Sequence, residues 1–143
     1  VPAVNLAARS SPTGPELRHS IVAKEQIMMW DPEILFLDLA TLQLGEAASG
    51  LHELRHDPAY RALSAVREGR VYGLLPYNWY ATNFGSVLAN AYYLGSVLYP
   101  NRFASVQVKE QSEDIFSFLV GEAVFDRLDQ ELSGMVFDSV RVQ

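Results

Sequence analysis

Two short apolar runs, residues 34–39 and 71–75, constrain the fold of this chain most strongly. Nearly continuous apolar runs of this length are typical of strands that are covered by helices on both faces. Helical patterns lie between the two runs, and strands that alternate with helices pair in parallel through right-handed crossovers. The sequence therefore predicts an α/β fold, with a mostly parallel sheet flanked by helices.

Helix signals surround the two predicted strands. Asp57 and Pro58 supply an N-cap and a first helical position, and Pro100 ends a long helix. Ser112 is the predicted N-cap of a later helix, with acidic residues in its first turn. The tail at 135–142 is expected to be extended. The predicted helices are residues 24–30, 46–54, 59–66, 84–99, 112–120 and 122–132.

Composition limits the size of the molecule and its partners. The chain has 143 residues, a formal net charge of −6 and no cysteine. One domain over residues 1–143 accounts for this length. An acidic chain without a Lys/Arg cluster is a poor candidate for binding nucleic acid or an anionic membrane, because both attract concentrated positive charge. The lack of cysteine excludes a disulfide framework and a thiolate metal site.

The uncharged stretch at residues 71–101 has the length of a membrane span, but its composition argues against one. It contains Pro76, Asn78, Thr82 and Asn90, and its most helix-like part is shorter than the roughly 20 apolar residues that a span needs. We therefore expect a buried helix of a globular domain.

Several short segments, weak individually, occur in an order and spacing that are more specific. Together they resemble the C-terminal lobe of the periplasmic-binding-protein family for ferric siderophores, haem and cobalamin, and the similarity extends over about residues 5–125. The segments are 5–7 (NLA), 23–27 (AKEQI), 31–34 (DPEI), 57–72 (DPAYRALSAVREGRVY), 98–100 (LYP) and Phe103.

The resemblance implies two α/β lobes joined by one long helix, with the ligand held in the cleft between them and delivered to the permease of an ABC importer. It implies a periplasmic or extracellular protein, free or membrane-anchored, without catalytic activity or cofactor. Because the chain begins at Val1 without a signal peptide, we expect an N-terminal lobe and the first strand-helix unit of this lobe to precede it. A sheet edge left unpaired by that cut favours pairing with a second copy.

The candidate ligand site is the loop that follows the second predicted strand. In open α/β sheets ligands bind at the carboxyl ends of the strands, and aromatic and amide side chains offer stacking and hydrogen bonds to a large ligand. The resemblance places a cleft tryptophan at Trp79. The alternative is that the aromatic rings pack against neighbouring helices and the amides cap turns. The candidate residues are Tyr77, Asn78, Trp79, Tyr80 and Asn83.

Glu25 is the candidate for docking to the permease. The resemblance implies one exposed glutamate per lobe that meets arginines of the membrane subunit, and Glu25 takes that position in this lobe. The alternative is a first-turn glutamate that stabilises the helix through the helix dipole.

A second functional hypothesis comes from His52-Glu53-Leu54-Arg55-His56, which matches the H-E-x-x-H pattern of zinc hydrolases. On one helix the two imidazoles would share a face and bind zinc, with Glu53 as the base. Pro58 ends any such helix, and no histidine follows His56. We therefore prefer the binding lobe and assign no metal site. A third hypothesis, a structural or regulatory domain without a cleft, predicts that the loop at 77–83 is buried.

Overall fold

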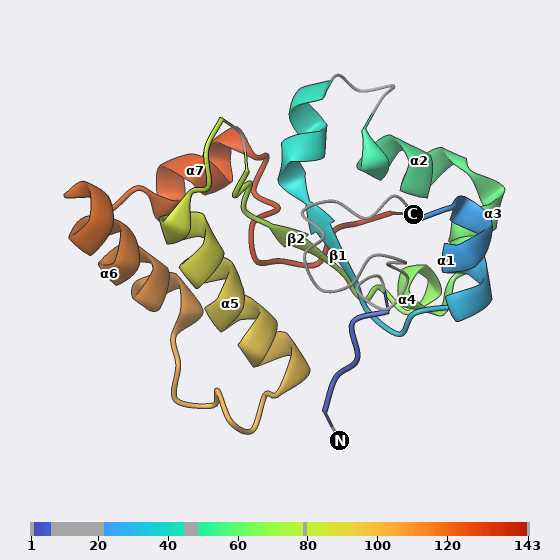
Figure 1. The fold of residues 1–143 in the computed structure, drawn as a ribbon, viewed down its shortest axis with the longest axis horizontal. Helices are drawn as coiled ribbons and strands as arrows, with labels where there is room; N and C mark the ends of the chain where they lie inside the picture. Colours follow the sequence, from blue (N-terminus) through green and yellow to red (C-terminus); the bar gives the residue numbers. More distant parts are fainter. Residues whose placement is uncertain (1, 7–21, 45–48, 79, 143) are drawn as a thin grey trace.

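The computed structural model describes residues 2–6, 22–44, 49–78 and 80–142. In these residues, seven α-helices and a small two-stranded parallel sheet form a mixed α/β fold (Figure 1). The elements in order are α1 (Lys24–Trp30), β1 (Leu35–Asp38), the 3-10 helix η2 (Leu39–Leu44), α2 (Gly50–His56), α3 (Pro58–Arg61), α4 (Ser64–Arg67), β2 (Val71–Leu74), α5 (Phe84–Leu98), α6 (Val108–Val120) and α7 (Phe125–Glu131).

The two predicted strands pair in parallel, as their spacing indicates. Leu35 lies opposite Val71, and the register continues to Asp38 opposite Leu74. The crossover between them contains η2 and helices α2–α4. Both strands therefore end at the same edge of the sheet, which is the edge that the loop after β2 extends.

The C-terminal tail lies along the other edge of β2. It is not extended throughout as predicted, because Phe137 has a positive φ of 59° and lies in a turn. The Phe137 N–H donates to the Gly73 carbonyl at 3.0 Å, and the Gly73 N–H donates to the Asp138 carbonyl at 3.1 Å. The Val140 N–H donates to the Val71 carbonyl at 2.8 Å. The tail thus satisfies backbone groups that would otherwise be open to another chain. Pairing with a second copy through a sheet edge stays a prediction.

Two clusters of buried side chains hold the helices on the sheet. Figure 1 shows α5, α6 and α7 on one side of the strands and α1–α4 on the other. The first cluster joins η2, the end of β2, α5, α6, α7 and the tail: Leu39, Leu75, Ala89, Phe116, Phe125, Leu132 and Val136. The second joins β2, α2, Leu63, α4 and the end of the tail: Leu51, Leu54, Leu63, Val66, Val71, Val140 and Val142.

Five of the six predicted helices have different limits, and one predicted cap is wrong. Helix α6 begins four residues before Ser112, whose buried hydroxyl donates to the Val108 carbonyl at 2.7 Å inside the helix. A serine that bonds back to the preceding turn is compatible with a helix interior, so its type does not mark a helix start. The helix predicted at 59–66 divides into α3 and α4, because Leu63 has extended backbone (φ −61°, ψ 138°) and its side chain is buried in the second cluster. The helices predicted at 46–54 and 122–132 are α2 and α7.

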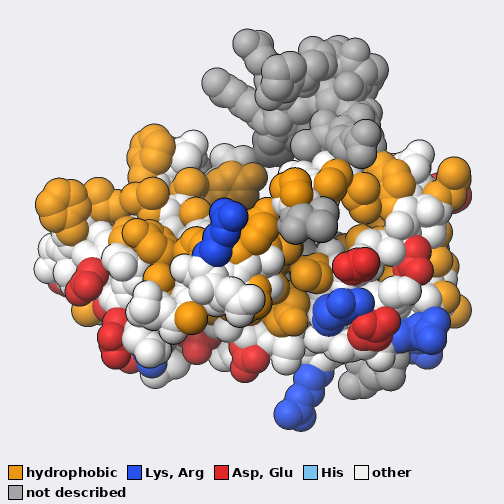
Figure 2. Space-filling model, turned by 90° about the horizontal axis from the view of Figure 1, so that it is seen from below, with side chains coloured by type: hydrophobic (Ala, Val, Ile, Leu, Met, Phe, Trp, Pro, Cys, Tyr) orange, Lys and Arg blue, Asp and Glu red, His pale blue; other side chains and the backbone are white. Residues whose placement is uncertain are grey.

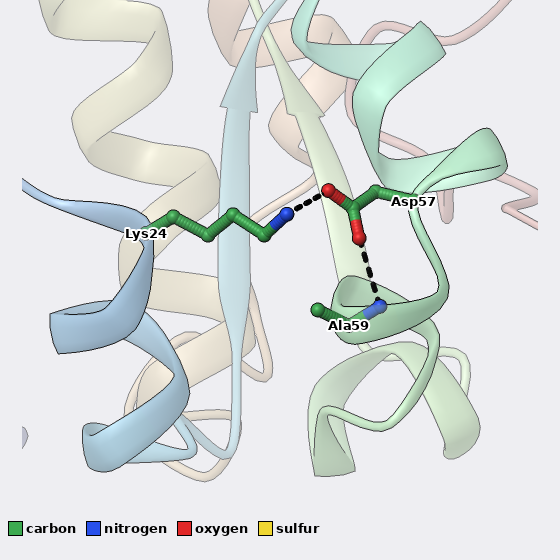
Figure 3. A network of polar contacts seen from close by, with 3 residues as sticks. All are labelled: Lys24, Asp57 and Ala59. Atoms are coloured by element: carbon green, nitrogen blue, oxygen red, sulfur yellow. Dashed lines mark hydrogen bonds and ion pairs between the residues drawn. The ribbon is translucent and has the colours of Figure 1, made fainter.

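Two aspartates hold α1 against α3 and α4, and Figure 3 shows the contacts of one of them, Asp57. Asp57 caps α3 by accepting the Ala59 N–H at 2.9 Å, as predicted, and it also pairs with the Lys24 ammonium at the start of α1. The hydrogen bonds from Lys24 and from the Ala59 N–H lower the pKa of the Asp57 carboxyl. Asp31, at the end of α1, accepts the N–H and the hydroxyl of Ser64, both at 2.7 Å. Helix α1 is therefore held at both of its ends.

No helix in the described part of the chain has the length and apolar character needed to cross a membrane. The longest of the described helices, α5, has 15 residues. Its buried face includes Ala89, Asn90 and Tyr93, whereas Phe84 and Leu88 are exposed. The helix predicted in the uncharged stretch is thus buried on one face and exposed on the other.

Candidate functional site

The loop after β2 lies at the carboxyl edge of the parallel sheet, next to the segment that follows β1 (Figure 1). The Asn83 N–H donates to the Tyr77 carbonyl at 2.8 Å, and Asn78 forms an isolated antiparallel bridge with Thr82. These contacts bring the two ends of the loop together. The residues between them form its tip.

The described side chains of this loop are exposed. Tyr80 is 97% exposed and Tyr77 is 40% exposed, and Asn78 and Asn83 also face solvent. Rings with this exposure do not serve as core packing, which was the alternative for the tyrosines. The third hypothesis, a domain whose loop is buried, disagrees with this exposure. Trp79 lies outside the described residues, so its partial exposure stays a prediction.

Asn83 has a structural role as a helix cap. Capping by the amide side chains was the stated alternative to ligand binding. Its side-chain oxygen accepts the Ser86 N–H at 3.1 Å and caps α5. This bond satisfies one of the free N–H groups of the first helical turn. The cap holds the loop at the start of α5, while the Asn83 side-chain NH2 group remains for other contacts.

Sequence reasoning missed the residue that anchors the loop, Asn90. This side chain, only 6% exposed, accepts the Leu75 N–H at 3.0 Å and donates to the Leu75 carbonyl at 2.9 Å. The residue at the end of β2 is thereby bonded to the middle of α5. The available signal was a single amide in an apolar helix pattern, since a buried polar group needs a partner.

An apolar surface adjoins the loop, where the start of α5 meets the end of α6. Gly85 permits this approach, because a Cβ there would lie 2.8 Å from the ring of Phe116. Figure 2 shows hydrophobic side chains exposed on the left, the side on which Figure 1 draws α6. We call these residues the α5–α6 apolar surface: Phe84, Val87, Leu88, Phe118, Leu119 and Val120.

Glu25 is exposed in the first turn of α1. Helix α1 runs antiparallel to β1, so its first turn points toward the edge at which both strands end (Figure 1). The adjacent Lys24 pairs with Asp57, and none of the ion pairs among the described residues includes Glu25. The exposed carboxylate is compatible with the alternative of a first-turn acid, and docking by Glu25 stays a prediction.

The H-E-x-x-H segment forms α2, which ends at His56 as Pro58 predicts. Ser49 caps this helix by accepting the His52 N–H at 3.0 Å. The His52 and His56 rings are stacked with centroids 4.0 Å apart. Within the described ranges, no group of three or more His, Cys, Asp and Glu side chains is arranged to hold a metal ion. The zinc-hydrolase hypothesis needs a third protein ligand, and the described residues place none beside the two imidazoles.

A depression of about 290 Å³ lies among α5, α6, α7 and the tail, away from the loop. Lys109 is its cationic lining residue, and the Lys109 ammonium already pairs with Asp126 at 2.7 Å. This pair raises the pKa of Lys109. The depression therefore presents a neutralised cation, and we assign it no ligand.

A scan against models of known protein families finds no match for this chain. A search of curated proteins also finds no relative.

Proposed function

We propose that this chain is the C-terminal, ligand-binding lobe of a solute-binding protein that serves an ABC importer. Its ligand is an iron complex, either a ferric siderophore or haem, or else cobalamin. The observation that carries the proposal is the exposed aromatic and amide loop at the carboxyl edge of a parallel sheet. That edge is where open α/β sheets bind ligands.

The chemistry of the loop supports a large and partly apolar ligand. Tyr77 and Tyr80 offer exposed ring faces for stacking, and Trp79 between them adds a third aromatic group. Asn78 offers an amide that both donates and accepts hydrogen bonds. Haem, cobalamin and aromatic siderophores combine flat apolar surface with polar groups, which is the combination that such a loop recognises.

The α5–α6 apolar surface supports a partner next to the loop. An exposed cluster of large apolar side chains at the edge of a candidate site is typical of a binding surface. In the proposed protein the N-terminal lobe closes over this edge, so that the ligand and the second lobe together cover the exposed rings. One lobe alone supplies about half of the contacts that a cleft ligand normally receives.

A titration of the complete protein tests this function. The Trp30→Phe variant leaves Trp79 as the one tryptophan of residues 1–143, and haem, a ferric siderophore and cobalamin are added separately. We expect saturable quenching by one of these classes. Tyr77→Ala combined with Tyr80→Ala should weaken binding by about tenfold or more, because two stacking contacts are lost. Residues 1–143 alone should bind much more weakly.

Met29→Ala is the control, because Met29 is an exposed apolar side chain on α1, away from the loop. Its affinity should equal that of the wild type. If none of the three ligand classes binds, or if the double loop variant binds as tightly as the control, the proposed function is wrong.

Glu25 supplies a separate prediction for docking. Glu25→Ala should leave the melting temperature and the ligand affinity nearly unchanged, because an exposed carboxylate contributes little to folding. Transport and permease binding should fall, by roughly 30-fold in docking affinity, because charge-assisted bonds to arginine are lost. Glu25→Arg should reduce both further by placing like charges together.

Glu33→Ala is the control for docking, since Glu33 is an exposed glutamate just after α1. Transport assays in cells and permease binding in detergent or nanodiscs give the two readouts. Unchanged transport in Glu25→Ala, or unfolding of that variant, would show that Glu25 acts only within its own helix.

A further inference from the structure

Helix α2 carries two imidazoles on one face. His52 and His56 are four residues apart, a spacing that brings side chains together on a helix. Their ring centroids lie 4.0 Å apart and the ring planes differ by 23°. Two nitrogens bound to one metal ion at about 2.1 Å can be no more than about 4.2 Å apart. The rings are stacked in this structure, so their lone pairs run nearly parallel. A turn of one ring about its side-chain bonds is needed to bring both sets of lone pairs to one ion.

One of the two rings is already oriented as metal-binding histidines usually are. His56 Nδ1 lies 2.9 Å from the His52 carbonyl oxygen. Because a carbonyl oxygen only accepts, Nδ1 carries the hydrogen, and in the neutral ring Nε2 is left with a free lone pair. Histidines that bind metals typically donate their other ring N–H to a carbonyl or carboxylate in this way, which fixes the ring.

The basic side chains nearest to α2 are engaged elsewhere. The Arg55 guanidinium donates to the Arg141 carbonyl at 3.2 and 2.9 Å, and the Arg61 guanidinium donates to the Arg55 carbonyl at 3.0 and 2.7 Å. Lys24 pairs with Asp57. Glu53, between the two histidines in sequence, is exposed. Of these three cations, Lys24 is paired with a carboxylate, whereas Arg55 and Arg61 keep their charge and are held in place by backbone carbonyls.

We propose that His52 and His56 form a two-imidazole site for a divalent transition-metal ion, with Cu²⁺ bound more tightly than Ni²⁺ or Zn²⁺. The order follows the general affinity series for nitrogen ligands, and imidazole suits all three ions whereas it does not suit Ca²⁺ or Mg²⁺. The remaining coordination positions are left to water. A catalytic zinc ion needs three protein ligands, so this site differs from the zinc-hydrolase hypothesis and does not depend on the proposed transport function.

A copper titration of the 143-residue chain at pH 7.5 tests the site. Calorimetry should give one Cu²⁺ per chain, and electron paramagnetic resonance should show coupling to two imidazole nitrogens. His52→Ala and His56→Ala should each weaken binding at least tenfold, and His56→Gln should do the same while keeping a good helix former. Because the pair is assembled only in the folded helix, Cu²⁺ should raise the melting temperature of the wild type and not of these variants.

His19→Ala is the control, since it removes the third histidine of the chain and leaves the pair intact. Binding should stay at the wild-type level. Equal affinity in the wild type and either single variant of the pair would overturn the proposal, because a chelate needs both rings. Loss of binding in His19→Ala, or equally tight binding of Mg²⁺, would also overturn it.

Discussion

Replacing Gly73 with alanine should lower the free energy of unfolding by about 3–5 kcal/mol and detach the C-terminal tail from β2. A Cβ at this position would lie 2.1 Å from the Met135 carbonyl oxygen and 3.0 Å from Leu39 Cδ1. The first contact is with backbone, so the tail can yield only by moving as a unit. That movement breaks the hydrogen bonds that join Gly73 to Phe137 and Asp138.

Gly50→Ala is the matched control for Gly73→Ala. A Cβ on Gly50, the first residue of α2, would have its nearest contact at 3.4 Å, with Leu37 Cδ1, which is ordinary packing. We expect a stability within about 0.5 kcal/mol of the wild type, or a small gain, because alanine restricts the unfolded chain. Urea unfolding followed by circular dichroism measures both variants. Similar midpoints for the two would mean that the tail does not pack against β2 as described.

The second large effect is expected for Asn90→Leu. Leucine removes both partners of the Leu75 backbone and leaves a buried N–H and a buried carbonyl without hydrogen bonds. An unsatisfied buried group costs about 1–3 kcal/mol, so the loss of stability should be about 2–5 kcal/mol. In the complete protein the ligand affinity should fall as well, because the base of the loop is no longer fixed to α5.

Asn101→Leu makes the same chemical change at an exposed position beyond α5. It should alter stability by no more than about 0.5 kcal/mol. Equilibrium unfolding in urea compares the two variants directly. If Asn90→Leu were as stable as Asn101→Leu, the side chain would not be the anchor of the loop.

Local signals predicted much of the fold. The limits of α1 were predicted correctly from its pattern and from Asp31-Pro32, and the cap at Asp57 is confirmed. The two strands were found because their runs are short, apolar and separated by helices. In each of these cases the determining interaction lies within a few residues of the chain, or in a crossover rule that holds for parallel strands generally.

The features that were missed depend on contacts between distant segments. Ser112 bonds within its helix, and the break at Leu63 follows from burial of that side chain against α2 and the tail. Asn90 acts through a residue 15 positions away. Propensity and capping patterns contain no information about such partners, and so they could not predict the loop anchor or the pairing of the tail with β2.

In the candidate site, too, local signals identified some features, and others depend on contacts between distant segments. The loop residues were identified from their types and from their position after a strand, and Tyr77, Asn78, Tyr80 and Asn83 are exposed there. The cap made by Asn83 and the surface formed by α5 and α6 follow from the packing of the helices. Ligand binding by the loop and docking by Glu25 stay proposals, which need a ligand and a permease to be tested.

Amide hydrogen exchange of the complete protein, with and without its ligand, tests whether the loop at 77–83 binds the ligand. Haem, a ferric siderophore and cobalamin are each added at saturating concentration, and exchange is followed by mass spectrometry. We expect the ligand that binds to slow exchange in residues 77–84, at the loop and the start of α5, and to leave α2–α4 unchanged. Protection that appears in α2–α4 or in the C-terminal tail, with none in the loop, would contradict this expectation.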